Sequence, residues 1–209
     1  MRLKHVKGAE EIVGSSKYVI KDYTEHKGSF NKLFNNNNPI RIEIGMGKGN
    51  FIIENAIKYP NINFIGIEKY DSVMVKAIRR LETLDLPNLR LIRMDAGKIE
   101  EVFDHEIDEV FLNFSDPWPK DRHAKRRLTS PNFLNKYKNI FKDKEIITFK
   151  TDNRKLFEYS VMSFNEQGFS IEELSLDLYN DDIDNNIPTE YEMKFHSKGF
   201  PIYRIRVYK

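Results

Sequence analysis

The sequence predicts an α/β fold in which helices cover both faces of a mostly parallel β-sheet. Short runs of β-branched residues alternate along the chain with segments whose apolar residues recur at helical spacing. This alternation is typical of parallel strands joined by crossover helices. A glycine-rich turn follows the first run, and 209 residues with 40% hydrophobic content are enough for one domain with a full core.

The predicted elements follow one another in a regular order. Apolar runs predict five strands, at 40–44, 62–67, 89–94, 109–114 and 145–149. Helical spacing predicts helices among them at 51–58, 73–84, 129–140 and 156–164. Pro60 ends the first of these helices, Pro131 lies in the first turn of the third, and Gly168 closes the last.

Two further strands are predicted near the C-terminus, at 169–178 and 202–208. In the second, Arg204 and Arg206 alternate with apolar residues, a pattern that suits an edge or half-exposed strand. The pattern alone leaves open whether these arginines are surface charges or contacts to phosphate.

We expect one domain over 1–209, made of a basic N-terminal arm (1–38) and a core (39–209). The polar turn 35–39 marks the end of the arm, and the acidic segment 181–186 is predicted to be an exposed loop before the last strand. The sequence leaves open whether the chain is a monomer or a homodimer.

The composition excludes several classes of protein. The chain has no cysteine, which rules out disulfides, a thiol nucleophile and a thiolate metal site. No apolar run reaches membrane-spanning length, and the basic N-terminus lacks the apolar stretch of a signal peptide, so we expect no membrane association and a cytoplasmic location. Four histidines, His5, His26, His105 and His196, are scattered and indicate no metal site.

The charges are segregated although the net charge is only +2. Asp121 is the only acid between 120 and 138, a segment rich in lysine and arginine, whereas 172–192 contains many acids and no base. This distribution is compatible with solvated loops, and it is also compatible with an anionic partner.

The glycine-rich turn and the acids near it predict a ligand site. Gly45 and Gly47 stand directly after the first strand and before a helix, where glycine lets a ligand touch the backbone. The GxGxG spacing and the absence of a Gly-Lys-Ser/Thr sequence exclude a P-loop, and Glu43, just before the turn, disfavours a pyrophosphate.

Two more acids end the second and third strands. Glu68 stands where an acid accepts hydrogen bonds from a ribose diol, and Asp95 stands where a carboxylate could accept from an adenine amino group. An ammonium, a ribose diol and an exocyclic amine without phosphate are combined in S-adenosylmethionine. Independent strand-end acids or helix caps are the alternative, and NAD stays open because it also uses an acid after the second strand.

The segment after the fourth strand, "NFSDPWPKDRHAKRRL", joins an acid and the only tryptophan to a basic cluster. Pro117 and Pro119 stiffen the loop that carries Asp116 and Trp118, and the fold places Asp116 beside the predicted ligand pocket. A rigid turn with Trp118 packed beneath it is the alternative interpretation.

The chain resembles the bacterial tRNA (guanine-N7-)-methyltransferases. The resemblance depends on the blocks "IEIGMGKGNF", "GIEKY", "RMDA", "NFSDPWPKDRHAKRRL", "FKTDN" and "TEYEMKF", and it extends from Ile40 to the C-terminus. It implies a Rossmann-like class I methyltransferase fold with a seven-stranded sheet whose last strand is antiparallel. The reaction it implies is methyl transfer from S-adenosylmethionine to N7 of a guanosine in the variable loop of tRNA.

The resemblance also implies roles for individual residues. Asp116 is implied to be the active-site acid and to line the cofactor site, together with Glu43, Gly45, Gly47, Glu68 and Asp95. The implied substrate contacts are Lys120, Asp152, Thr189, Glu190, Tyr191 and Glu192. From the residues alone, Asp152 would be read as a cap for the helix that begins near Asn153.

The chemistry agrees with these roles. N7 of guanine carries a lone pair and no proton, so the reaction needs no general base, and carboxylates can accept hydrogen bonds from the guanine N1 and amino groups. Phosphates of tRNA would be neutralised by the basic cluster, formed by Arg122, His123, Lys125, Arg126 and Arg127.

Two alternatives stay open, namely an amino-methyltransferase that acts on adenine and a non-catalytic RNA-binding protein of the same fold.

Overall fold

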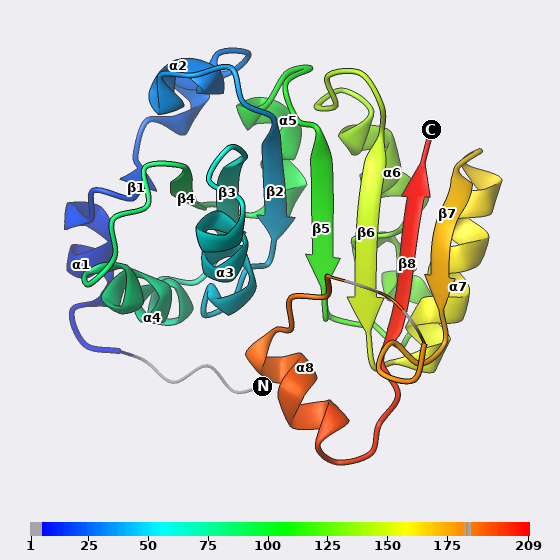
Figure 1. Cartoon of the computed structure of the whole chain (residues 1–209). Coiled ribbons are helices and arrows are strands. Elements are labelled where there is room, and N and C mark those ends of the chain that lie inside the picture. The colour runs from blue at the N-terminus through cyan, green and yellow to red at the C-terminus, as the bar shows by residue number, and fades with distance from the viewer. Residues whose placement is uncertain (1–5, 182, 184) are drawn as a thin grey trace.

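The computed structural model describes residues 6–181, 183 and 185–209. An eight-stranded sheet with the strand order β1-β4-β3-β2-β5-β6-β8-β7 runs through the molecule (Figure 1). His5 of the scattered histidines and Asp182 and Asp184 of the acidic loop lie outside the described residues.

Seven strands form the predicted Rossmann-like core. They are β2 (Ile40–Ile44), β3 (Asn63–Glu68), β4 (Leu89–Arg93), β5 (Glu109–Asn113), β6 (Ile146–Thr151), β7 (Ser170–Ser175) and β8 (Tyr203–Tyr208). The strands from β2 to β6 pair in parallel, and β8 is antiparallel to β6 and β7. The predicted fold class is confirmed. The sheet has an eighth strand because the N-terminal arm adds β1 (Val19–Ile20), which pairs in parallel with β4.

Helices pack on both faces of the sheet and create two apolar clusters. One cluster takes its buried side chains from α1 (Ala9–Ser15), α3 (Asn50–Lys58) and α4 (Asp71–Leu81). The other takes them from α2 (Phe30–Phe34), α5 (Ile99–Val102), α6 (Pro131–Tyr137) and α7 (Arg154–Glu166). Three 3-10 turns, η1 (Tyr23–His26), η2 (Ala96–Lys98) and η3 (Asp121–Arg126), lie in the connections. Within the described ranges, no helix is both long and apolar enough to cross a bilayer.

The N-terminal arm is packed into the domain. Its Tyr18 hydroxyl donates a hydrogen bond of 2.7 Å to the carbonyl of Leu84 and accepts one of 3.1 Å from the backbone N–H of Leu86. Helix α1 of the arm packs on α4, and β1 extends the sheet beyond β4. The arm therefore closes one edge of the core.

The last strand is interior to the sheet, which excludes the edge position among the two alternatives for 202–208, whereas its partly exposed side chains agree with a half-exposed strand. β8 lies between β6 and β7, with ladders on both sides. Arg204 bonds Glu173 at 2.7 Å, and Arg206 bonds Glu172 at 2.6 Å and Glu109 on β5. The positive charges of Arg204 and Arg206, which had suggested a strand open to solvent, are thus neutralised by acids on other strands of the same sheet.

Candidate active site

The glycine turn after β2 leaves open space above its backbone. The N–H groups of Gly45 and Met46 donate to the carbonyl of Ile67 at 2.9 and 3.0 Å, which fixes the turn against β3. Gly45 and Gly47 have φ values of +79° and +59°, and a Cβ atom at either position would meet no atom within 4 Å. The turn can therefore present its backbone directly to a ligand.

Two buried acceptors lie beside this turn, on neighbouring strands. Glu43 is 2% exposed, and its Oε1 accepts a hydrogen bond of 2.9 Å from the side-chain amide of Asn113 at the end of β5. Glu43 Oε2 and Asn113 Oδ1 are also buried, and neither has a hydrogen-bond partner among the described residues. Such acceptors fit a ligand that brings an ammonium group or another N–H donor. Sequence reasoning missed Asn113.

The burial of Glu43 changes its pKa. It raises the pKa of Glu43 to about 7, because desolvation disfavours the carboxylate more than the hydrogen bond from Asn113 and the charge of Lys150 favour it. The charge of Glu68 acts in the same direction as burial. A cationic ligand beside Glu43 would reverse this shift.

Glu68 connects the glycine turn to the end of β3. Its Oε2 accepts from the N–H of Gly47 at 3.1 Å, and its Oε1 accepts from the N–H groups of Lys69 and Tyr70 at 2.8 and 3.0 Å. Burial raises the pKa of Glu68, and the charge of Asp116 adds to that effect. Glu68 thus lies close enough to both Glu43 and Asp116 for an electrostatic effect between Glu68 and each of them.

Asp95 stands at the next strand end and has two partners. One oxygen caps η2 by accepting from the N–H of Gly97 at 2.8 Å, so the helix-cap interpretation is correct for this residue. The other accepts from Lys69 Nζ at 2.7 Å, and this hydrogen bond lowers the pKa of Asp95. Because each carboxylate oxygen has a second lone pair, the cap does not prevent contact with a ligand.

The loop that carries Asp116 is strained on both sides. Phe114 and Trp118 have φ values of 52° and 42°, in the left-handed region that bulky residues rarely adopt. Backbone strain of this kind persists only where the surroundings enforce it, and it is concentrated at functional sites. The side chain of Asp116 is exposed at the carboxyl edge of the sheet.

Arg127 helps to enforce that conformation. Its Nε donates to the carbonyl of Pro117 at 3.2 Å, its Nη2 donates to that of Trp118 at 3.1 Å, and its guanidinium lies 4.2 Å from the ring of Tyr159. Arg127 is half-buried and holds the loop of Asp116 through these donors, and its contact with RNA stays a prediction.

The rest of the basic cluster faces outward. Arg122 and Lys125 are exposed, as is Lys120, a predicted substrate contact just before the cluster, and none of the three has an acidic partner among the described residues. Arg126 lies over one face of Trp118 at 4.9 Å, and His123 packs edge-on against the same ring. Trp118 therefore organises the cluster, which leaves a positively charged surface beside Asp116.

A short helix missed by sequence reasoning carries most of the other predicted residues. Helix α8 (Glu190–His196) lies beyond the carboxyl ends of β5 and β6 (Figure 1). Thr189 and Glu192 form a capping box at its start. Glu190 pairs with Lys48 of the glycine turn, and the ring of Tyr191 lies 5.0 Å from that of Phe114.

Glu192 points into the protein, which corrects its predicted contact with substrate. It is 0% exposed and bonds Lys150 Nζ at 2.6 Å. The same ammonium donates to Asn186 Oδ1 at 3.1 Å and to the carbonyl of Ile187 at 3.0 Å. Burial lowers the pKa of Lys150, and the charge of Glu192 opposes this shift. Through these bonds, Lys150 of β6 holds both α8 and the preceding residues Asn186 and Ile187 in place.

Asp152 is left available for a partner. The cap of α7 is Asn153, whose side chain accepts from the N–H of Leu156 at 2.9 Å, so the interpretation of Asp152 as a helix cap was wrong. Asp152 is half-buried, and its Oδ2 is 3.5 Å from the hydroxyl of Tyr191. The structure thus places Asp152, Tyr191 and Asp116 around the same edge of the sheet.

Known proteins resemble this chain along almost its whole length. The family model described as "Putative methyltransferase" matches residues 37–205. A tRNA (guanine-N(7)-)-methyltransferase of Bacillus cytotoxicus is 52% identical over 98% of this chain and 95% of its own length. One of Geobacillus sp. (strain WCH70) is 51% identical over 99% and 95%. Among solved structures, an antibiotic-related methyltransferase has a TM-score of 0.64 at 16% identity over 87% of this chain and 92% of that one, which supports the fold alone.

Proposed function

The chain belongs to the tRNA (guanine-N(7)-)-methyltransferase family, and from this membership we propose that it methylates N7 of a guanosine in the variable loop of tRNA, with S-adenosylmethionine as the methyl donor. Membership extends over the full catalytic part of the chain, since the relatives align over at least 95% of their own length. It favours guanine over the adenine alternative and a catalytic protein over a binding protein.

The observation that carries the cofactor assignment is the pair of buried acceptors without donors, Glu43 Oε2 and Asn113 Oδ1. We assign this pair to the amino group of the cofactor's methionine part, beside the exposed backbone of Gly45 and Gly47. We assign Glu68 to the ribose hydroxyls and Asp95 to the adenine amino group. The bound cofactor supplies a methyl group on a positively charged sulfur.

The remaining residues position the purine and stabilise charge. The N7 lone pair attacks without loss of a proton, so the protein contributes orientation and electrostatics. The carboxylate of Asp116 favours the positive charge that moves onto the purine. We infer that Asp152 and Glu190 accept hydrogen bonds from the guanine N1 and amino groups and that Lys120 binds a phosphate.

The proposal is tested by methyl transfer from labelled S-adenosylmethionine to an unmodified tRNA transcript, followed by nucleoside analysis. We expect 7-methylguanosine from a position in the variable loop. Methyladenosine as the product would overturn the guanine assignment, and a protein that binds tRNA without turnover would overturn the assignment as an enzyme.

The elevated pKa of Glu43 gives a prediction for cofactor binding. Because a cationic amino group prefers the ionised carboxylate, the affinity for S-adenosylmethionine should rise with pH up to about pH 7 and level off above it, and binding should release a proton in the range where the affinity rises. Calorimetric titration in buffers of different ionisation enthalpy measures both effects. Glu43→Gln should bind more weakly and lose the pH dependence; an unchanged dependence in this variant would refute the assignment.

The exposed basic cluster gives a second prediction. Replacing Arg122, Lys125 and Arg126 together by alanine should weaken tRNA binding and flatten its salt dependence, by roughly 0.7 to 0.9 in log–log slope for each phosphate that the variant no longer neutralises. Binding is measured by filter retention over a series of salt concentrations.

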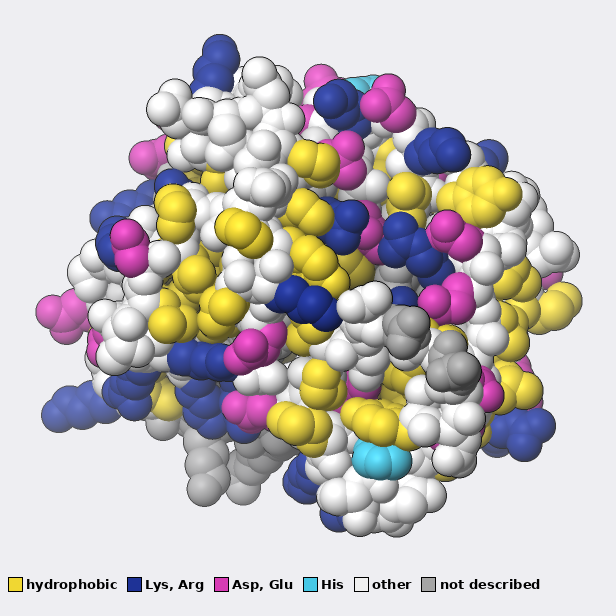
Figure 2. Space-filling view, in the orientation of Figure 1, with side chains coloured by type: hydrophobic (Ala, Val, Ile, Leu, Met, Phe, Trp, Pro, Cys, Tyr) yellow, Lys and Arg dark blue, Asp and Glu magenta, His cyan; other side chains and the backbone are white. Residues whose placement is uncertain are grey.

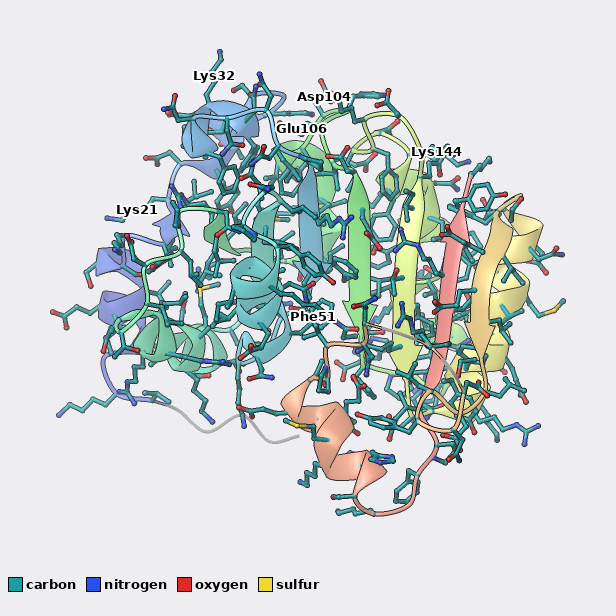
Figure 3. All side chains as sticks on the ribbon, viewed as in Figure 1. Lys21, Lys32, Phe51, Asp104, Glu106 and Lys144 are labelled. Atoms are coloured by element: carbon teal, nitrogen blue, oxygen red, sulfur yellow. The ribbon has the colours of Figure 1, made fainter. Side chains whose placement is uncertain are left out.

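The matched control removes Lys32, Lys142 and Lys144, which are exposed. Lys32 and Lys144 lie at the opposite edge of the sheet from α8 (Figure 3). We expect the control variant to keep the affinity and the slope. Equal losses of affinity in the two triple variants would show that tRNA binding responds only to the net charge of the protein. Such a result would exclude η3 from the interface with tRNA.

A further inference from the structure

A row of aromatic rings leads outward from the active site along α8. The ring of Phe114 lies 5.0 Å from that of Tyr191, Tyr191 stacks on Phe195 at 4.2 Å and 18°, and Phe195 lies 5.7 Å from Phe200. We call these four residues the aromatic row. It begins two positions before Asp116 and ends beyond the last turn of α8.

The end of α8 is built to place Phe200 in the row. The N–H of Phe200 donates to the carbonyl of Phe195 at 3.2 Å, and the N–H of Gly199 donates to that of His196 at 2.8 Å. Gly199 has a φ of +79°. This is the hydrogen-bond pattern of a Schellman motif, which turns the chain back so that the residue after the glycine contacts the last helical turn.

The outer part of the row is not part of the core. Tyr191 is 44% exposed and Phe200 is 49% exposed, as is Met193 between them in the sequence at 46%. Hydrophobic side chains are visible at the surface over α8 in the space-filling view (Figure 2). The helix is held instead by buried Glu192 and by the stack of Tyr179 on His196 at 3.6 Å. The Schellman contact therefore explains why Phe195 and Phe200 touch, and it leaves unexplained why Phe200 is exposed and Phe195 only half-buried.

The charges around the row select its partner. Lys194 and Lys198 lie on and after the same helix, and the ammonium of Lys198 is 5.4 Å from the ring of Phe195. Exposed aromatic faces interleaved with lysines are what single-stranded nucleic acid uses, because unpaired bases stack on the rings while the cations follow the phosphates. Lysine is depleted at protein–protein interfaces, so Lys194 and Lys198 disfavour a protein partner.

We propose that the outer part of the aromatic row, Tyr191, Phe195 and Phe200, is a stacking platform for an unpaired base that neighbours the methylated guanosine in tRNA. The proposal depends on the proposed function and adds to it a binding site for a second nucleotide. Continuity with Phe114 places that nucleotide beside the target, and the aromatic contact is tolerant of base identity because every base offers a flat face.

The test is steady-state methylation of an unmodified tRNA transcript by variants of Phe200. Phe200→Ala should raise KM for tRNA about tenfold, the effect of losing one base stack, with most of the loss in KM rather than in kcat. Phe200→Leu keeps apolar area without a flat ring and should be about as impaired, whereas Phe200→Trp should restore most of the affinity. Met162→Ala removes another exposed apolar side chain, on α7, and serves as the control with unchanged kinetics.

Further measurements separate the outcomes. Affinity for S-adenosylhomocysteine and the thermal midpoint should be the same in all Phe200 variants, because the platform contacts neither the cofactor nor the core. Wild-type KM in Phe200→Ala, or full recovery by Phe200→Leu, would overturn the platform. A change in sedimentation mass without a change in KM would assign the surface to a second copy of the chain and would also overturn it. Absence of 7-methylguanosine with wild-type protein would instead refute the proposed function.

Discussion

Replacing Asp116 by alanine is expected to reduce methyl transfer by at least about 10²-fold, the usual loss when a preorganised charge is removed from a transition state. Positive charge moves onto the purine as the methyl group is transferred, and the carboxylate of Asp116 is the acid that the strained loop presents at the carboxyl edge of the sheet. Because its side chain is exposed before substrate binds, its removal should leave folding and most of the tRNA affinity intact. Single-turnover kinetics and filter retention measure the two quantities.

Asp116→Asn is the matched variant, since it keeps the shape and removes the charge. We expect it to be almost as slow as the alanine variant. The opposite pattern, with weak binding and nearly normal single-turnover rates at saturation, is expected of the triple variant of the basic cluster. If tRNA binding and turnover fell together in both Asp116 variants, the residue would be supporting the loop rather than the reaction.

Replacing Lys150 by methionine should produce the largest loss of stability. Lys150 and Glu192 have side chains that are 2% and 0% exposed, and removing one partner leaves the other as an uncompensated buried charge. Breaking such a pair costs about 3–5 kcal/mol of unfolding free energy, whereas replacing both partners by neutral residues costs much less. Chemical denaturation of Lys150→Met should therefore show a strongly reduced midpoint.

The double variant Lys150→Met/Glu192→Gln tests whether the stability is lost because a buried charge is left uncompensated or because packing is lost. We expect it to recover much of the stability that Lys150→Met loses. A double variant no more stable than the single one would indicate that the hydrogen bonds of Lys150 to Asn186 and Ile187 hold the segment, with no special role for the ion pair. A single variant as stable as wild type would contradict the prediction altogether.

The parallel half of the sheet could be predicted from sequence because its determinants are local. β5, for example, is buried along its whole length and contains the continuous apolar run Val110–Leu112, as expected of a strand covered on both faces of a parallel sheet. The carboxyl ends of parallel strands meet at one edge, so Glu43, Glu68 and Asp116 could be expected to converge once the strands were placed.

Helix α8 was missed because it is short and does not bury an apolar stripe. Its seven residues carry exposed Tyr191 and Met193, and its one fully buried side chain is an acid. Periodicity cannot detect such a helix. The capping box formed by Thr189 and Glu192 was the available signal.

The other differences concern arginines whose partners the local sequence does not reveal. Arg206 reads as a solvated strand residue until Glu109 is known to lie two strands away in the same sheet. In the sequence, Arg127 stands among lysines and arginines that are exposed. Only the folded loop shows that its guanidinium donates hydrogen bonds to the carbonyls of Pro117 and Trp118. Side chains whose partners are distant in sequence carry no local signature of their role.

The interior position of β8 has a consequence for how the protein is made. β7 has β8 as its sheet neighbour, and the ladder of β8 to β6 completes the same half of the sheet. A nascent chain on the ribosome can assemble β2 to β6 early, but β7 stays unpaired until residues 203–208 have been synthesised and inserted between two existing strands. Such non-local pairing is slow, and the waiting strand edges are prone to aggregation. Insertion of residues 203–208 between β6 and β7 is thus the step that completes the sheet.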